Sequence, residues 1–484
     1  MGSLPDDLSD WLDEMVIPDG TPYLLSPRFE YDVALNEYFL QVNHLIAPQN
    51  TSLNRARALK RFLDFLWTAR GGRWWRDATE ADHLAFHQWR RRDEAGPQVE
   101  GTTWGQEVTL VNQFYLWAVR KGHVAEVPIP QRARRSAPVE LGLRLARTEG
   151  TVPATFAHDE KRDLVEWMPP GDYRCWRDVG LRGYGPDGLP TGRFRGRWAS
   201  RNSAYTDLMI RTGMRISEQS SLALAEVPRH PTTGGFQRFW LPGVIAKYSS
   251  ARWIYVPASV GADLTAYVED DRADIVDRAR SAGRYDRLRR PLVMEDPGDP
   301  NSVRQVGSLA RRKLKLHRIG PQDRPRLLVD TPDGLEPAAF WLSELGFQMA
   351  VSSWEDVFAS TNARCNAAGL GRLHCHAHLL RHSFAVITLE QLQRGHIAAL
   401  AGLTPAQRVH HSRIFGDPLD WVRRRLGHRS ILHTLIYLHA LQELEMETRM
   451  ALVPDTWEDP RATPLGLVDD DVTSPHDDEA EGKR

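Results

Sequence analysis

Residues 378–385 read His-Leu-Leu-Arg-His-Ser-Phe-Ala, and this stretch decides how the rest of the chain is interpreted. On a helix, His378 and Arg381 would share one face because they are three residues apart. A planar guanidinium can hold two oxygens of a phosphate at once and stays charged at physiological pH. A neighbouring histidine can donate to the same phosphate or carry a proton. The stretch therefore predicts a phosphate-binding site on a helix.

A second guanidinium stands upstream, in the segment Thr-Gly-Met-Arg-Ile-Ser-Glu that ends at Glu218. This guanidinium belongs to Arg215. A phosphodiester under nucleophilic attack gains negative charge, and fixed cations from two separate segments can stabilise that charge. We therefore expect Arg215 and Arg381 to act on one phosphate.

Lys247 is the only lysine between positions 161 and 313 of a chain that has 7 lysines and 55 arginines. The flanking segments 238–245 and 252–257 are rich in aromatic and β-branched residues, which predicts two short strands joined by a turn. A lysine can protonate a leaving oxygen, whereas arginine has too high a pKa to do so. Lys247 is therefore the candidate proton donor.

The last segment is Leu426-Gly427-His428, and Tyr437 follows nine residues after His428. A tyrosine can form a reversible covalent link to a phosphate. Its ordinary pKa of about 10 means that it needs a base or a cationic setting to lose its proton. Tyr437 is therefore the candidate nucleophile.

Taken in the order Arg, Lys, His-x-x-Arg, His, Tyr, these segments resemble the signature of the tyrosine recombinase (phage integrase) family. The resemblance implies a mainly α fold with a small β-sheet (α+β), in which a helical core-binding domain and a catalytic domain form a C-shaped clamp on DNA. It implies that Tyr437 attacks a DNA phosphate to give a 3′-phosphotyrosyl intermediate and that Lys247 protonates the departing oxygen. The catalytic residues that it assigns are Arg215, Lys247, His378, Arg381, His428 and Tyr437, with Glu218 orienting Arg215 and His382 packing or hydrogen-bonding behind them.

The same resemblance implies partners. They are double-stranded DNA with attachment or recombination sites, three further copies of the chain in a homotetramer on that DNA, and an accessory directionality factor. No metal and no cofactor are implied, and a C-terminal helix near 440–452 would dock on a neighbouring subunit. The activity would integrate or excise a mobile element. The alternative is a catalytically silent DNA-binding regulator on the same fold, against which the intact set of residues argues.

Composition and proline placement predict the domain organisation. The formal net charge is −1, but the two ends carry 16 of the 63 acids and only 3 of the 62 bases, so residues 21–454 are about +12. Such a body could neutralise a DNA backbone. Helical spacing of apolar residues, with bases such as Arg61 and Arg90 beside them, predicts a helical domain with one basic face. The predicted parts are an acidic arm at 1–27, a core-type DNA-binding domain at 28–128, a linker at 129–149, a catalytic domain at 150–454 and an acidic disordered tail at 455–484.

The catalytic domain departs from the family in length. Arg381 and His428 are 47 residues apart, about twenty more than is usual in the family, so that 395–417 reads as an insertion and the packing of His428 stays open. Segments 170–199 and 280–330, rich in Gly, Pro and Arg, also read as irregular insertions.

Other function classes find less support. His374, Cys375, His376 and the upstream Cys365 could suggest zinc and a metal-dependent nuclease, but their spacing fits no closed tetrahedral pattern well. Three cysteines fit a reducing compartment, and a cytoplasmic, nucleoid-associated protein is expected. No run of about eighteen apolar residues predicts a membrane span.

Overall fold

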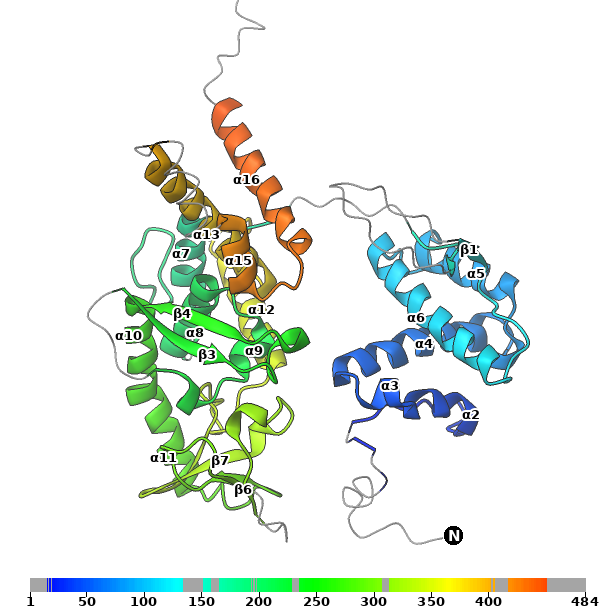
Figure 1. Cartoon of the computed structure of the whole chain (residues 1–484), viewed down its shortest axis with the longest axis horizontal. Helices are drawn as coiled ribbons and strands as arrows, with labels where there is room; N and C mark the ends of the chain where they lie inside the picture. Colours follow the sequence, from blue (N-terminus) through cyan, green and yellow to red (C-terminus); the bar gives the residue numbers. More distant parts are fainter. Residues whose placement is uncertain are drawn as a thin grey trace, which may run out of the picture. The chain divides into compact units, whose positions relative to one another are not determined.

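The computed structural model describes residues 15–133, 151–157, 165–228, 235–306, 313–401, 404 and 417–450, apart from positions 16, 19, 193, 195 and 197. The chain divides into two compact units, Met1–Asp163 and Leu164–Arg484. Helices predominate in both, and the strands form small sheets (Figure 1). The predicted mainly α fold with small β-sheets is confirmed.

The first unit is built on three longer helices, with shorter ones before them. Its core is aromatic: Phe62, Trp75, Trp104 and Phe114 are almost fully buried. Burial of side chains this large is the main favourable contribution to the stability of a domain of this size. The helices are α2 (Val33–Asn36), α3 (Val42–Leu45), α4 (Gln49–Ala69), α5 (Glu80–Arg91) and α6 (Gly101–Arg120).

Two sequence predictions for this unit need correction. Arg90 is not on an open basic face, because it is buried against Glu107, which also accepts from Arg61. The unit also continues past 150, since β1 (Gln131–Ala133) pairs antiparallel with β2 (Thr151–Pro153). The second domain therefore starts later than the predicted position. The predicted tail at 455–484 lies outside the described residues. So does most of each of three other predicted parts, namely the arm at 1–27, the linker at 129–149 and the insertion at 395–417.

In the second unit a β-hairpin buries one face, and its second strand contacts three helices, α8, α10 and α15. In Figure 1 the hairpin lies across α8 and beside α10, and α15, which ends at Leu426, contacts its second strand. α13 packs on α8, α15 and α16, so two segments that are distant in sequence, α8 and the consecutive helices α15 and α16, meet on one helix. The helices are α7 (Pro170–Gly180), α8 (Ala199–Thr212), α9 (Ile216–Ser220), α10 (Ala258–Tyr267), α11 (Ala273–Ser281), α12 (Val351–Ala367), α13 (Ala377–Ala401), α15 (Pro418–Leu426) and α16 (Leu432–Met450).

The predicted strand-turn-strand around Lys247 is present as β3 (Phe236–Leu241) and β4 (Arg252–Pro257), paired antiparallel with Leu241 opposite Arg252. The first strand ends earlier than the predicted residue 245. Pro242 follows Leu241 and has no N–H to extend the ladder. The connection between the strands is therefore longer than expected.

Two predicted irregular insertions contain regular structure. Residues 170–180 form α7, because Tyr173, Trp176 and Val179 recur on one face and are buried in the core. Within 280–330 lie the strands β5 (Leu292–Met294), β6 (Val303–Gln305) and most of β7 (Leu327–Thr331), which with β8 (Gly334–Pro337) form a sheet of order β6-β5-β7-β8. The Gly, Pro and Arg content of both segments concealed these apolar positions.

The helix after the last motif is continuous. α16 runs from Leu432 to Met450, so Tyr437 and the expected C-terminal helix near 440–452 belong to one element. In the part of the chain that the structure describes, no helix is both long and apolar enough to cross a bilayer.

Candidate active site

Arg381 is the centre of the site. Its side chain is 2% exposed and donates to the carbonyls of Gly213, at the end of α8, and Leu426, at the end of α15, the latter at 2.6 Å. Both helices can end there because Gly213 and Gly427 take positive φ values of 66°, which favour glycine. Arg381, on α13, therefore joins its own helix to the segment that carries Arg215 and to the segment that carries His428.

A buried carboxylate supports the second guanidinium. Glu218 is 0% exposed, and its Oε1 accepts from Nη1 of Arg215 at 3.0 Å. Its Oε2 accepts from the backbone N–H of Arg215 at 3.0 Å and from Nη2 of Arg252 at 2.6 Å. Burial alone would raise the pKa of Glu218, but Arg252 and Arg215 lower it to about 2. Glu218 is therefore ionised, and it accepts hydrogen bonds from both the side chain and the backbone N–H of Arg215.

The turn that contains Lys247 also contacts the carboxylate of Glu218. The backbone N–H of Lys247 lies 3.4 Å from Oε1 of Glu218, while the Lys247 side chain is exposed. Tyr248 and Ser249 have φ values of 59° and 54°, so the turn is strained. Arg429 holds it by donating to the carbonyl of Tyr248 at 2.8 Å. The ammonium group of Lys247 can thus move while its backbone is fixed to the cluster.

The histidines of α13 lie one turn apart. The ring centroids of His378 and His382 are 4.8 Å apart. Burial, Arg381, Arg215 and Lys247 all lower the pKa of His378, so the predicted cations act on this ring together. His382 is half-buried, and its pKa is lowered to about 4 by burial and then by His378 and Arg381.

Tyr437 is 1% exposed and points into this group. Its Oη lies 3.0 Å from Nδ1 of His382, and its ring is nearly parallel to that of His428 at a centroid distance of 6.3 Å. His428 is itself held, with Nδ1 3.0 Å from Oγ1 of Thr434. Burial raises the pKa of Tyr437, and Arg381 and Arg215 act against that rise.

The structure therefore brings together the residues that the sequence singles out. Two guanidiniums, of Arg215 and Arg252, are paired with the carboxylate of Glu218, and Arg381 adds a third cation to the same group, which leaves an excess of positive charge suited to a phosphate diester. Sequence reasoning missed Arg252 and Thr434, whose signals were weak: Arg252 is one of 55 arginines and Thr434 has no motif. The predicted residues that meet here are Arg215, Glu218, Lys247, His378, Arg381, His382, His428 and Tyr437.

The His and Cys residues near 375 form no metal centre in the described ranges, where no group of three His, Cys, Asp or Glu side chains is placed to hold an ion. Cys365 and Cys375 are buried and in contact with the backbone of other residues. Burial raises the pKa of Cys375 well above its usual value. The two thiols pack as small apolar groups.

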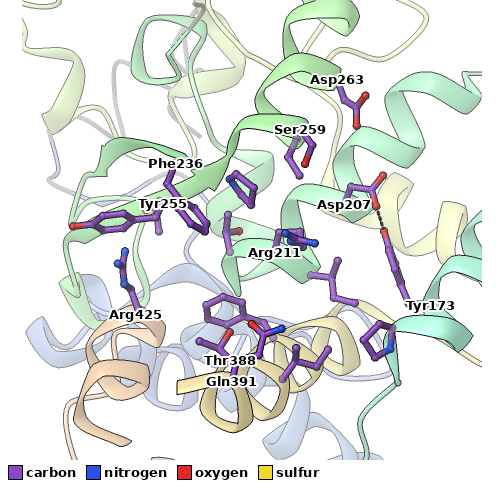
Figure 2. Close-up of a pocket in the computed structure, with 18 of the residues that line it drawn as sticks. Tyr173, Asp207, Arg211, Phe236, Tyr255, Ser259, Asp263, Thr388, Gln391 and Arg425 are labelled. Atoms are coloured by element: carbon purple, nitrogen blue, oxygen red, sulfur yellow. Dashed lines mark hydrogen bonds between the residues drawn. The ribbon is translucent and has the colours of Figure 1, made fainter. Parts of the chain in front are cut away.

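A separate cavity of about 680 Å³ lies between the hairpin and α13, and its lining includes none of the predicted site residues (Figure 2). On one side Tyr173 donates to Asp207 at 2.8 Å. On the other, the guanidinium of Arg425 lies over the ring of Tyr255 at 3.2 Å and that of Trp421 at 4.2 Å. Arg425 comes from α15, so the cavity and the site share elements but no predicted side chain.

Comparison with known proteins gives structural similarities only. No family model matches the chain, and no curated protein matches it. Over 84% of this chain and 81% of the other, it is similar to the XerH site-specific recombinase bound to its palindromic difH substrate, with 12% identity and a TM-score of 0.46. The Tn1549 transposon integrase in complex with circular intermediate DNA gives 12% identity and 0.45 over 86% and 99%. A lambda integrase dimer bound to a COC′ core site gives 11% and 0.43 over 84% and 93%.

Proposed function

We propose that this chain is a site-specific DNA recombinase that cleaves and rejoins strands through a 3′-phosphotyrosyl intermediate. The observation that carries the proposal is the position of Tyr437. Its buried hydroxyl lies 3.0 Å from Nδ1 of His382, and the charges of Arg381 and Arg215 both lower its pKa, which supports a role as a nucleophile toward a phosphate bound by these arginines. A tyrosine with a packing role alone would not need two arginines from separate segments near its hydroxyl.

Each residue then has a chemical task. Arg215 and Arg381 hold the non-bridging oxygens of the phosphate and stabilise the charge that develops on them. Glu218 and Arg252 keep Arg215 in its orientation. The exposed ammonium of Lys247 protonates the departing 5′-oxygen, because its backbone anchor on Glu218 keeps it beside the cluster. His378 and His428 donate to the same phosphate, as the resemblance implies.

The substrate of this proposal is double-stranded DNA containing two recombination sites, held by a homotetramer. The helical first unit supplies further phosphate contacts, which fix register before any base is read. Integration or excision of a mobile element, with an accessory factor that sets direction, is the event that such chemistry serves.

The test uses the full chain and DNA that it selects for itself. Duplexes are enriched by binding from a random pool, and the enriched site is rebuilt with a nick so that the cleaved strand diffuses away. We expect the wild-type chain to become covalently joined to this DNA and the Tyr437→Phe variant to bind it without joining. Binding without any adduct in the wild type would instead identify a silent DNA-binding regulator. An adduct that persists in Tyr437→Phe would show that another residue is the nucleophile.

A further inference from the structure

The hydroxyl of Tyr437 must lose its proton when it attacks phosphorus, and burial makes this loss harder. The side chain is 1% exposed and the pKa of its hydroxyl is raised. Bulk water therefore has little access to the proton. A protein group has to accept it.

The neighbouring groups can be considered in turn. Arg381 and Arg215 are cations and bring no lone pair to accept a proton. Glu218 accepts hydrogen bonds from two arginines, which use both of its oxygens. The ring of His428 is nearly parallel to that of Tyr437 at a centroid distance of 6.3 Å, and its Nδ1 is hydrogen-bonded to Thr434. Among the described contacts of these groups, none is a hydrogen bond to Oη of Tyr437.

His382 does form such a contact. Its Nδ1 lies 3.0 Å from Oη of Tyr437, across the interface between α13 and α16. With the proton on Nε2, the neutral ring would offer the Nδ1 lone pair to the hydroxyl. The ring is fixed by its position on α13, directly after Arg381 and one turn after His378. Geometry therefore favours this residue over the others.

We propose that His382 accepts the proton of Tyr437 during strand cleavage, an inference that rests on the proposed function. In that step the bond between Oη and phosphorus forms and the bond between phosphorus and the 5′-oxygen breaks. The hydroxyl proton passes to Nδ1 of His382, and the 5′-oxygen takes a proton from Lys247. Religation reverses each transfer, so no further reactant is consumed.

The substrate itself would make His382 a stronger base. In the free chain the imidazolium form is disfavoured by burial and by nearby cations, which lower the pKa of His382 to about 4. A DNA phosphate seated on Arg381 would bring negative charge to the same place and offset those cations. Tyr437 would thus be deprotonated only with DNA in the site. The titratable or charged groups that act on His382 are His378, Arg381 and His376, with Tyr437 as its hydrogen-bond partner; Arg215 and His428 act on or lie beside Tyr437.

The experiment separates proton acceptance from positioning. His382→Asn places an amide oxygen where Nδ1 was, so it can accept a hydrogen bond from Tyr437 but cannot take its proton. Single-turnover cleavage of the nicked substrate is measured at saturating DNA, where binding does not limit the rate. We expect the rate to fall by at least about 100-fold, the usual effect of losing a general base. His374→Asn, at an exposed histidine before α13, is the matched control and should cleave like the wild type.

A second measurement distinguishes the loss of a base from a misfolded variant, because only a folded variant can be rescued. Tyr437 is replaced by a fluorinated tyrosine, whose phenol is more acidic and needs a base less. If His382 takes the proton, this replacement should restore most of the cleavage rate in His382→Asn and change the wild-type rate little. Wild-type rates in His382→Asn, or equal effects of fluorination in both proteins, would overturn the inference. Failure of the proposed function would look different, because the wild type itself would then form no adduct.

Discussion

Arg252 Nη2 lies 2.6 Å from Oε2 of Glu218, and both side chains are buried. The pair joins the strand after the Lys247 turn to the short helix that begins beside Arg215. Arg252 also donates from Nε to the carbonyl of Arg425 at 2.8 Å, which brings α15 into the same contact. One ion pair therefore fixes the relative positions of three candidate functional segments.

Removal of the carboxylate should destabilise the fold. In Glu218→Gln the guanidinium of Arg252 stays buried without its counter-ion, and breaking such a pair costs about 3–5 kcal/mol. We expect urea denaturation of the full chain at neutral pH to show this loss in the free energy of unfolding. Glu295→Gln, which removes an exposed ion pair with Arg304 in the same unit, is the control and should leave stability unchanged. Equal stability of Glu218→Gln and the wild type would contradict the structural role given to the pair.

The buried histidines predict how stability depends on pH. Burial, followed by Arg381 and Arg215, lowers the pKa of His428 from its usual 6.5 to about 3 in the folded chain. Between these values the unfolded chain binds a proton that the folded chain does not, so the free energy of unfolding falls as pH falls through this window. We expect the wild type to lose more stability between about pH 7 and pH 5 than His428→Asn and His428→Gln do. The same slope in all three proteins would show that His428 can become protonated while folded.

Local patterns predicted the parts of the site whose spacing is set by helical geometry. His378 and Arg381 share a face because α13 is regular there, whereas Tyr437 was singled out because the order and spacing of four segments resemble a family signature. Arg252 could not be found in this way. Its role depends on a contact with a residue 34 positions earlier, and nothing in its immediate sequence distinguishes it from the other arginines.

The fold was predicted least well where composition and packing disagree. Glycine, proline and arginine made 170–199 look irregular, although Tyr173 and Trp176 are buried in α7. Arg90 looked like a surface base and is instead neutralised by Glu107 inside the first unit. In both cases a tertiary contact determines whether the residue is buried, and the periodicity of the sequence cannot reveal that contact.

Cleavage should not need a divalent metal ion. Arg215 and Arg381 supply the positive charge that an ion would otherwise bring to the phosphate, and they remain charged in the presence of a chelator. We expect the covalent adduct with the nicked substrate to form at the same rate with and without EDTA. If EDTA abolishes cleavage and added magnesium restores it, the chain uses a metal-dependent mechanism and the guanidinium cluster has another purpose.

The assignment of Lys247 can be tested by changing the leaving group. Lys247→Ala removes the ammonium but keeps the backbone N–H that lies 3.4 Å from Glu218, so the turn itself should persist. Cleavage of a normal substrate should slow by about 100-fold or more, because the 5′-oxygen then departs without a proton. A substrate with sulfur in place of that oxygen needs no proton to leave, and we expect it to be cleaved by Lys247→Ala almost as fast as by the wild type.

Arg429→Ala is the comparison, since Arg429 holds the turn through the carbonyl of Tyr248. This variant keeps the ammonium of Lys247 and only loosens its turn, so its defect on the normal substrate should be smaller and should also diminish with the sulfur substrate. If sulfur fails to rescue Lys247→Ala, the proton comes from another group, and His378 is the next candidate because Arg381, Arg215 and Lys247 all act on its ring.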